Sequence, residues 1–284
     1  MLKTIIKEFS KLVNENSNFI LKIFIAKIIN KPIEQIFFEN LNLSSTEIDT
    51  LKKYIDEYLA GKPVSKIIHE SCFYGYNFYV NEDVLDPRMD TEVLVDAVIH
   101  DFKNHTAPLT ILDICTGSGV ILLTLLKELP NSSGIGLDIS DKALYVAKKN
   151  CNNLNLSKRA NFIQSDFCST ISSEKYFSKF DIIVSNPPYI KTRDIQNLDK
   201  SVINYDPLIA LDGGKNGTNA YIRILSKIGQ LLTPNGKVYF EIGYDILDDV
   251  KQIVSESEFS LQKIIKDLHN IDRVLVLNKK SLKN

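Results

Sequence analysis

The sequence contains no tryptophan, only two methionines and only four cysteines among its 284 residues. Cys72, Cys115, Cys151 and Cys168 are scattered along the chain, and no two of them form a C-x-x-C pair. This spacing argues against a zinc site and against a disulfide framework. We therefore expect no metal ion and a reducing compartment, the cytosol.

Long apolar runs are also missing. No stretch of about 18 uncharged apolar residues is present, so we expect no membrane span. The first eight residues mix Lys and Glu with apolar side chains, without the unbroken apolar segment and cleavage site of a signal peptide. These absences indicate a cytoplasmic protein with no membrane partner.

Charge of one sign is not in excess, because 34 Lys and Arg stand against 35 Asp and Glu. Neither the first 85 residues nor the remainder is markedly basic. Affinity for nucleic acid without sequence preference comes mainly from neutralising phosphates. We therefore expect nucleic acid not to be the partner, a local basic patch being the alternative.

A chain of this length favours two domains over one. We expect a helical domain over residues 1–70, where Ile5, Ile6, Phe9, Leu12 and Val13 follow the spacing of one helix face. Residues 71–85 contain short aromatic runs around a glycine and predict a hairpin linker. Residues 86–284 form the second domain. The helical domain is either a structural cap or a docking surface for a substrate.

Strand and helix patterns alternate from residue 109 onward, which predicts a doubly wound α/β sheet. A helix follows Pro87-Arg88-Met89, with Asp90 or Thr91 as its expected N-cap. Helices are expected over 120–129, 142–153 and 220–232, and a long loop through residues 212–214. The expected strands cover residues 109–114, 135–139, 162–166, 181–185, 237–242, 261–265 and 273–277.

The stretch Asn186-Pro187-Pro188-Tyr189 follows one of these strands directly, at the edge where open α/β sheets bind ligands. Asn186 offers a carbonyl acceptor, and the two prolines carry carbonyls but no N–H donors. Tyr189 adds a flat aromatic face. The stretch suits the binding of a planar NH2 group, the alternative being a tight Pro-Pro turn.

A second motif lies at the first strand-to-helix turn and ends in Gly117-Ser118-Gly119. Asp138 follows 19 residues later, near the end of the second strand, where a carboxylate binds ribose hydroxyls. A dinucleotide is disfavoured because no third glycine completes G-x-G-x-x-G. S-adenosylmethionine fits better, since its positive charges favour acidic surroundings such as Asp113.

Together these motifs resemble the class I S-adenosylmethionine-dependent methyltransferases, and among them the protein-(glutamine-N5) methyltransferase family, the release factor glutamine methyltransferases above all. The resemblance extends over nearly all of the chain. It rests on the two motifs above, with Pro87-Arg88-Met89-Asp90-Thr91-Glu92, Ser165-Asp166-Phe167, Tyr205-Asp206-Pro207, Ala210-Leu211-Asp212-Gly213-Gly214, Glu241-Ile242-Gly243, Lys266-Asp267-Leu268 and Asp272-Arg273-Val274.

The resemblance implies a Rossmann-like doubly wound sheet, S-adenosyl-L-methionine as cofactor, and a peptide chain release factor as substrate in translation termination. Asn186, Pro187 and Tyr189 would be catalytic, and they would bind the substrate glutamine together with Pro188. Arg88 and Thr91 would form part of the pocket wall. The expected cofactor contacts are Asp113, Cys115, Thr116, Gly117, Ser118, Gly119, Asp138, Asp166, Phe167 and Asn186.

Two positions depart from the family pattern. Cys115 stands where release-factor enzymes usually carry glycine, as in the sister enzymes that methylate a large-subunit ribosomal protein, and Met89 replaces a proline. Asp90-Thr91-Glu92 resembles the release-factor pattern. The alternatives are glutamine methylation of that ribosomal protein, an adenine-N6 nucleic-acid methyltransferase, and a silent binding module.

Overall fold

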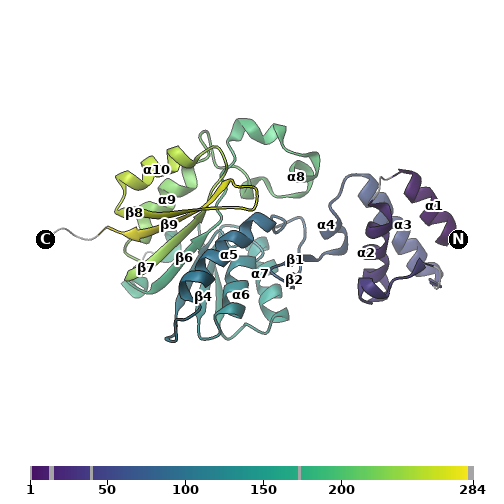
Figure 1. The fold of residues 1–284 in the computed structure, drawn as a ribbon, viewed down its shortest axis with the longest axis horizontal. Helices are drawn as coiled ribbons and strands as arrows, with labels where there is room; N and C mark the ends of the chain where they lie inside the picture. Colours follow the sequence, from purple (N-terminus) through teal and green to yellow (C-terminus); the bar gives the residue numbers. More distant parts are fainter. Residues whose placement is uncertain (1, 13–15, 39–40, 172–173, 281–284) are drawn as a thin grey trace.

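The computed structural model describes residues 2–12, 16–38, 41–171 and 174–280. A helical bundle at one end of the elongated molecule carries the N-terminus, and a larger α/β region carries the C-terminus at the other (Figure 1). Among the described residues, no helix is both long and apolar enough to cross a membrane.

The N-terminal bundle consists of α1 (Leu2–Leu12), α2 (Ser17–Ile29), the short 3-10 turn η1 (Ile33–Gln35), α3 (Ser45–Leu59) and α4 (Val64–Ile68). Ser44 and Glu47 cap the start of α3 reciprocally in a capping box. Phe9, Leu21, Phe24 and Leu51 form a buried apolar cluster within the bundle. Val13 of the predicted pattern lies outside the described residues.

The predicted hairpin is present as β1 (Ser71–Phe73) and β2 (Tyr76–Phe78), paired antiparallel. Its two phenylalanines, Phe73 and Phe78, are fully buried in the apolar cluster beneath the large sheet. The hairpin therefore packs as part of the α/β region.

Seven strands form one sheet in the order β5-β4-β3-β6-β7-β9-β8. The first five strands of this order are parallel, whereas β9 is antiparallel to both β7 and β8. All seven predicted strands are present: β3 (Thr110–Ile114), β4 (Ser133–Asp138), β5 (Ala160–Gln164), β6 (Phe180–Ser185), β7 (Leu232–Glu241), β8 (Phe259–Lys266) and β9 (Asp272–Lys279).

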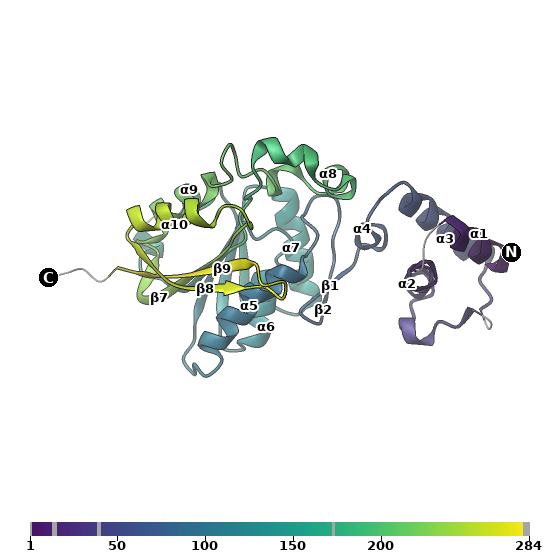
Figure 2. The ribbon, with the colours of Figure 1, turned by 45° about the horizontal axis from the view of Figure 1, so that its top comes forward.

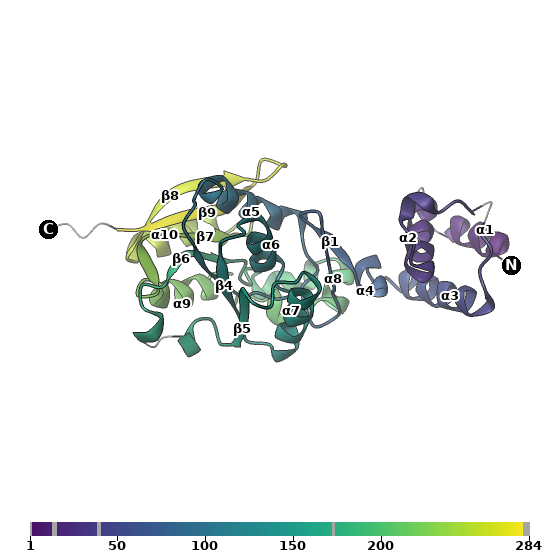
Figure 3. The same cartoon turned by 90° about the horizontal axis from the view of Figure 1, so that it is seen from below.

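Both faces of the sheet are covered. Along β6, Ile182 and Val184 pack in one apolar cluster and Ile183 in the other, as the two-residue period of a strand requires. The first cluster includes α5 (Met89–Phe102), α6 (Val120–Glu128) and part of α7 (Asp141–Asn153), and the second includes α9 (Asn219–Ile228) and α10 (Leu247–Glu256) (Figure 3). The doubly wound architecture is confirmed.

Three local predictions were wrong. The N-cap of α5 is Arg88, not Asp90 or Thr91, and the Thr91 side chain is instead buried. The helix expected over 220–232 ends at Ile228, because β7 already begins at Leu232. The expected long loop contains η5 (Thr192–Asn197), α8 (Lys200–Tyr205) and η6 (Leu208–Ala210).

In Figure 2, α8 lies on the side of the α/β region that faces α4.

Candidate active site

The turn between β3 and α6 contains three residues in the left-handed conformation. Cys115 has φ 63°, Gly117 φ 55° and Gly119 φ 82°. A side chain at Gly119 would also meet Leu123 and Ala147 at 3.1 and 3.3 Å. This backbone explains why glycine suits position 115, since a Cβ there is strained by roughly 1–2 kcal/mol.

Asp138, the last residue of β4, faces this turn. Its Oδ2 accepts a hydrogen bond from the Gly117 N–H at 2.9 Å, and its Oδ1 accepts one from the Ser140 N–H at 3.0 Å. Burial raises the pKa of the Asp138 carboxyl, and the backbone hydrogen bonds oppose that shift. Each oxygen keeps a further lone pair, so the carboxylate remains able to accept a pair of hydroxyl groups.

Asp166 and Phe167 follow β5, with Phe167 at φ 50°. Arg223 from α9 contacts both: its guanidinium pairs with the Asp166 carboxylate and lies 4.6 Å from the centre of the Phe167 ring. Arg223 was not predicted, because neither its spacing nor its neighbours in the sequence mark it. It joins α9 to the end of β5.

Asn186 to Tyr189 form the segment that leaves β6. The Asn186 Nδ2 donates a hydrogen bond to the Thr91 Oγ1 at 3.2 Å, which joins this segment to α5. Tyr189 donates its hydroxyl hydrogen to the Glu241 Oε1 at 3.3 Å. A Cβ added to Gly213 would lie 2.7 Å from the Tyr189 Cα. A Cβ added to Gly243 would lie 2.9 Å from the Tyr189 ring. Two loops therefore approach Tyr189 so closely that only glycine fits.

A cavity of about 550 Å³ connects these segments at the carboxyl edge of the sheet. Its wall contains eleven of the predicted positions: Arg88, Thr91, Cys115, Thr116, Gly117, Ser118, Asp138, Asp166, Phe167, Asn186 and Pro188. Four others are not part of the wall: Asp113, Gly119, Pro187 and Tyr189. Asp113 is buried behind the turn and bonds Thr116, and Gly119 ends the turn before α6. Pro187 and Tyr189 are next to the wall residues Asn186 and Pro188 in the sequence.

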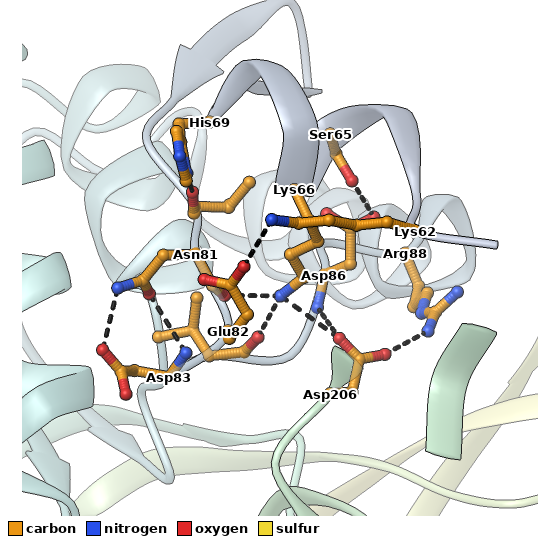
Figure 4. Close-up of polar contacts among 12 residues, drawn as sticks. Lys62, Ser65, Lys66, His69, Asn81, Glu82, Asp83, Asp86, Arg88 and Asp206 are labelled. Carbon is orange, nitrogen blue, oxygen red and sulfur yellow. Dashed lines mark hydrogen bonds and ion pairs between the residues drawn. The ribbon is translucent and has the colours of Figure 1, made fainter. Parts of the chain in front are cut away.

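A polar cluster around Lys66 and Asp206 joins α4 to the α/β region (Figure 4), and Val84 and Arg88 of this cluster line the cavity. Lys66 of α4 has no exposed surface; its Nζ donates to the carbonyls of Asn81 at 2.6 Å and Val84 at 2.5 Å and lies 3.2 Å from the Asp206 Oδ1. Arg88 bonds the other Asp206 oxygen at 2.8 Å. One buried carboxylate thus holds α4, the entry to α5 and the end of α8 together.

Asp113 is buried, and burial raises its pKa to about 7 against a hydrogen bond from the Thr116 hydroxyl at 2.6 Å. Since this folded-state value lies above the ordinary 3.8, the folded protein holds the proton more tightly than the unfolded chain. The resulting stabilisation is full below the ordinary pKa and is lost as the pH rises towards 7, at roughly 1.4 kcal/mol per pKa unit.

We therefore expect the free energy of unfolding, measured by urea denaturation without cofactor, to fall between about pH 4 and about pH 7. Asp113→Asn has no carboxyl to titrate and should show a shallower decline. An equal slope in both proteins would contradict the assignment. Glu241 also has its pKa raised to about 7 by burial, so some slope should remain in the variant.

Comparison with known proteins adds a family model and three relatives. The family model described as a methyltransferase domain matches residues 105–279. The release factor glutamine methyltransferase of Agrobacterium fabrum is 42% identical over 228 residues, covering 79% of this chain and 77% of the relative. That of Thermodesulfovibrio yellowstonii is 36% identical over 281 residues, covering 98% and 96%. The chain spans about half, 52%, of the bifunctional methyltransferase of Rickettsia prowazekii.

Among solved structures, the hMettl16 catalytic domain in complex with the MAT2A 3′UTR hairpin 6 is similar with a TM-score of 0.56. It is 15% identical, and the match covers 86% of each chain. The likeness supports the fold alone.

The methyltransferase domain implies S-adenosylmethionine as cofactor, and the site fits such a molecule. The cavity is large enough for a drug-sized ligand. Asp138 offers spare acceptors at the end of β4, and the glycine turn exposes backbone beside it. Acidic side chains in the wall suit a cationic ligand.

Proposed function

This chain belongs to the family of release factor glutamine methyltransferases, and we propose that it methylates the side-chain nitrogen of a glutamine in a peptide chain release factor. The observation that carries the proposal is the placement of Asn186. Its Nδ2 is held by Thr91, and the residue lines the same cavity as Asp138. Asn186, which can accept a hydrogen bond from the substrate amide, and Asp138, which can accept hydrogen bonds from ribose hydroxyls, therefore line the same cavity.

The cofactor S-adenosylmethionine supplies an electrophilic methyl group. The substrate nitrogen is a poor nucleophile, because its lone pair is delocalised into the carbonyl. We assign Asn186 Oδ1 and the Pro187 carbonyl as acceptors of the two N–H bonds, which fixes the nitrogen and draws electron density towards it. Tyr189, locked by Gly213 and Gly243, is assigned to pack on the amide plane. Orientation of this kind contributes up to roughly 7–11 kcal/mol.

The remaining wall residues are proposed as cofactor contacts. Asp138 suits the ribose hydroxyls, and the turn from Cys115 to Gly119 suits the methionine part. Asp166 and Phe167 suit the adenine, and Arg223 holds both in place. Asp113 acts behind the wall, where its bond to Thr116 maintains the turn.

The helical bundle is proposed as the docking domain for the release factor. A second cavity of about 640 Å³ lies between the end of α3, at Tyr58 and Leu59, and α8, at Ser201 and Val202. Arg88 lines both this cavity and the cofactor cavity. A loop of the substrate that enters between bundle and α8 would reach Asn186 along this side.

A methyl-transfer assay tests the proposal. Labelled S-adenosylmethionine is offered with a release factor, with a large-subunit ribosomal protein and with duplex DNA in separate reactions, and the modified residue is mapped by peptide mass spectrometry. We expect label on a glutamine of the release factor alone. Label on the ribosomal protein or the DNA would overturn the substrate, and no label in any reaction would favour a binding module.

A further inference from the structure

The amide of Asn186 has two orientations of nearly equal shape, because its oxygen and its nitrogen are similar in size. Asn186 can accept a hydrogen bond from the substrate NH2 group only when its Oδ1 points towards the substrate. With Nδ2 in that place, two donors would face each other. Something other than packing must therefore select the orientation.

Thr91 makes the selecting contact. Its Oγ1 lies 3.2 Å from the Asn186 Nδ2, and the residue is 3% exposed, so water does not compete for the bond. An amide nitrogen only donates, so Thr91 must accept here. The hydroxyl hydrogen of Thr91 then has to point elsewhere.

The Glu241 carboxylate, at the end of β7, interacts with the Thr91 hydroxyl, which lowers the pKa of Glu241. It is 1% exposed, and among the residues that the structure describes its Oε2 has no partner within ordinary hydrogen-bond geometry, while Oε1 accepts from Tyr189. A longer contact with the Thr91 hydroxyl nevertheless favours the ionised form of Glu241. A buried oxygen without a full partner is rare and calls for an explanation.

The groups around Glu241 have opposing effects on the pKa of its carboxyl. Burial raises its pKa to about 7, the Thr91 hydroxyl and the Arg273 guanidinium lower it, and Asp90 raises it. Arg273 itself is engaged with Asp267 at 2.9 Å and Asp90 at 3.3 Å. The Tyr221 hydroxyl bonds the main-chain carbonyl of Glu241, at 2.7 Å, and not its carboxylate.

Resting on the proposed function, we propose that Glu241 and Thr91 are positioning residues that orient the Asn186 amide for the substrate. Ionised Glu241 accepts the Thr91 hydrogen, so the Thr91 oxygen accepts from Nδ2 and Oδ1 faces the cavity. Protonated Glu241 can donate to Thr91 instead. The Thr91 hydrogen is then free to donate to Oδ1, which turns Nδ2 towards the substrate and blocks it.

The first test needs no substrate. In protein labelled with ¹⁵N at asparagine, the Asn186 side-chain NH2 signal, identified by its loss in Asn186→Ala, is followed against pH. We expect it to titrate near pH 7 in the native protein, and to be flat in this range in Glu241→Gln and in Thr91→Val. A flat signal in the native protein, or an unchanged titration in Thr91→Val, would overturn the inference.

The second test is kinetic, and Thr91→Ser is the matched control because it keeps the hydroxyl. Thr91→Val should lower kcat by roughly 10-fold or more, as expected for a lost positioning contact, with the dissociation constant of S-adenosylmethionine unchanged. Thr91→Ser should restore most of the rate, and kcat of the native protein should fall below about pH 7. Equal rates for Ser and Val would overturn the role of the hydroxyl. A native protein inactive on release factor would count against the proposed function, while the NMR titration would still decide the inference.

Discussion

Replacing Asn186 by alanine is expected to lower kcat by about 10²–10³-fold, the loss typical for removal of one preorganised hydrogen-bonding group from a reaction site. The variant lacks the side-chain acceptor for the substrate NH2, so the nitrogen is neither oriented nor polarised. The dissociation constant of S-adenosylmethionine should change little, because Asp138 and the glycine turn remain. Steady-state kinetics with a release factor, together with calorimetric titration of the cofactor, measures both quantities.

Asp138→Ala is the matched control, since it alters the opposite end of the same cavity. It should weaken S-adenosylmethionine binding, with the larger effect on the dissociation constant. Comparable losses of turnover and cofactor affinity in Asn186→Ala would contradict the role assigned to Asn186. The same pattern in both variants would show that the cavity had collapsed as a whole.

Replacing Lys66 by methionine is expected to lower the free energy of unfolding by about 3–5 kcal/mol, the usual loss when one partner of a buried ion pair is removed. Lys66 is fully buried and the Asp206 side chain is 3% exposed, so the variant would leave a buried carboxylate without this cation and without water in its place. The carbonyls of Asn81 and Val84 would also lose their donor. Urea denaturation followed by circular dichroism measures the loss.

Two further variants make this test specific. Arg88→Ala removes the other cation of Asp206, but Arg88 is 44% exposed, so water replaces it and the loss should stay below about 1 kcal/mol. In Lys66→Met combined with Asp206→Asn the remaining charge is gone, and part of the stability should return. A double variant less stable than the sum of the single losses would show that Asp206 matters for another reason.

The sheet and the ligand segments could be predicted because they are local in sequence. Each strand is a short apolar run, and Asn186 directly follows one strand while Asp138 ends another, so the strand itself carries the side chain to the site. Thr91 shows the limit of such reasoning. Its place at the start of α5 favoured a capping role, but its hydroxyl bonds a residue 95 positions away. A local pattern holds no information about that pairing.

Arg223 and Glu241 were missed as site residues for related reasons. Arg223 lies on α9 and reaches the end of β5 only after the sheet has assembled. Glu241 belongs to a segment that carried the family resemblance, yet a glutamate at the end of a strand is ordinarily solvated. Its burial depends on α5, β9 and Tyr189 closing around it. The long loop also hid short helices, because α8 has six residues and too few apolar positions to show a period.

The helical bundle has an apolar core of its own, formed by Phe9, Leu21, Phe24, Leu51 and their neighbours. Polar contacts join it to the catalytic region: Lys66 bonds the carbonyls of Asn81 and Val84 and pairs with Asp206, Ser65 bonds Asp86, and Lys62 pairs with Glu82 (Figure 4). Substitutions on the outer faces of α1 to α3 therefore need no compensating change around Asn186. In evolutionary terms, a bundle with the docking role proposed above could change together with its protein substrate while the residues around Asn186 stay constant.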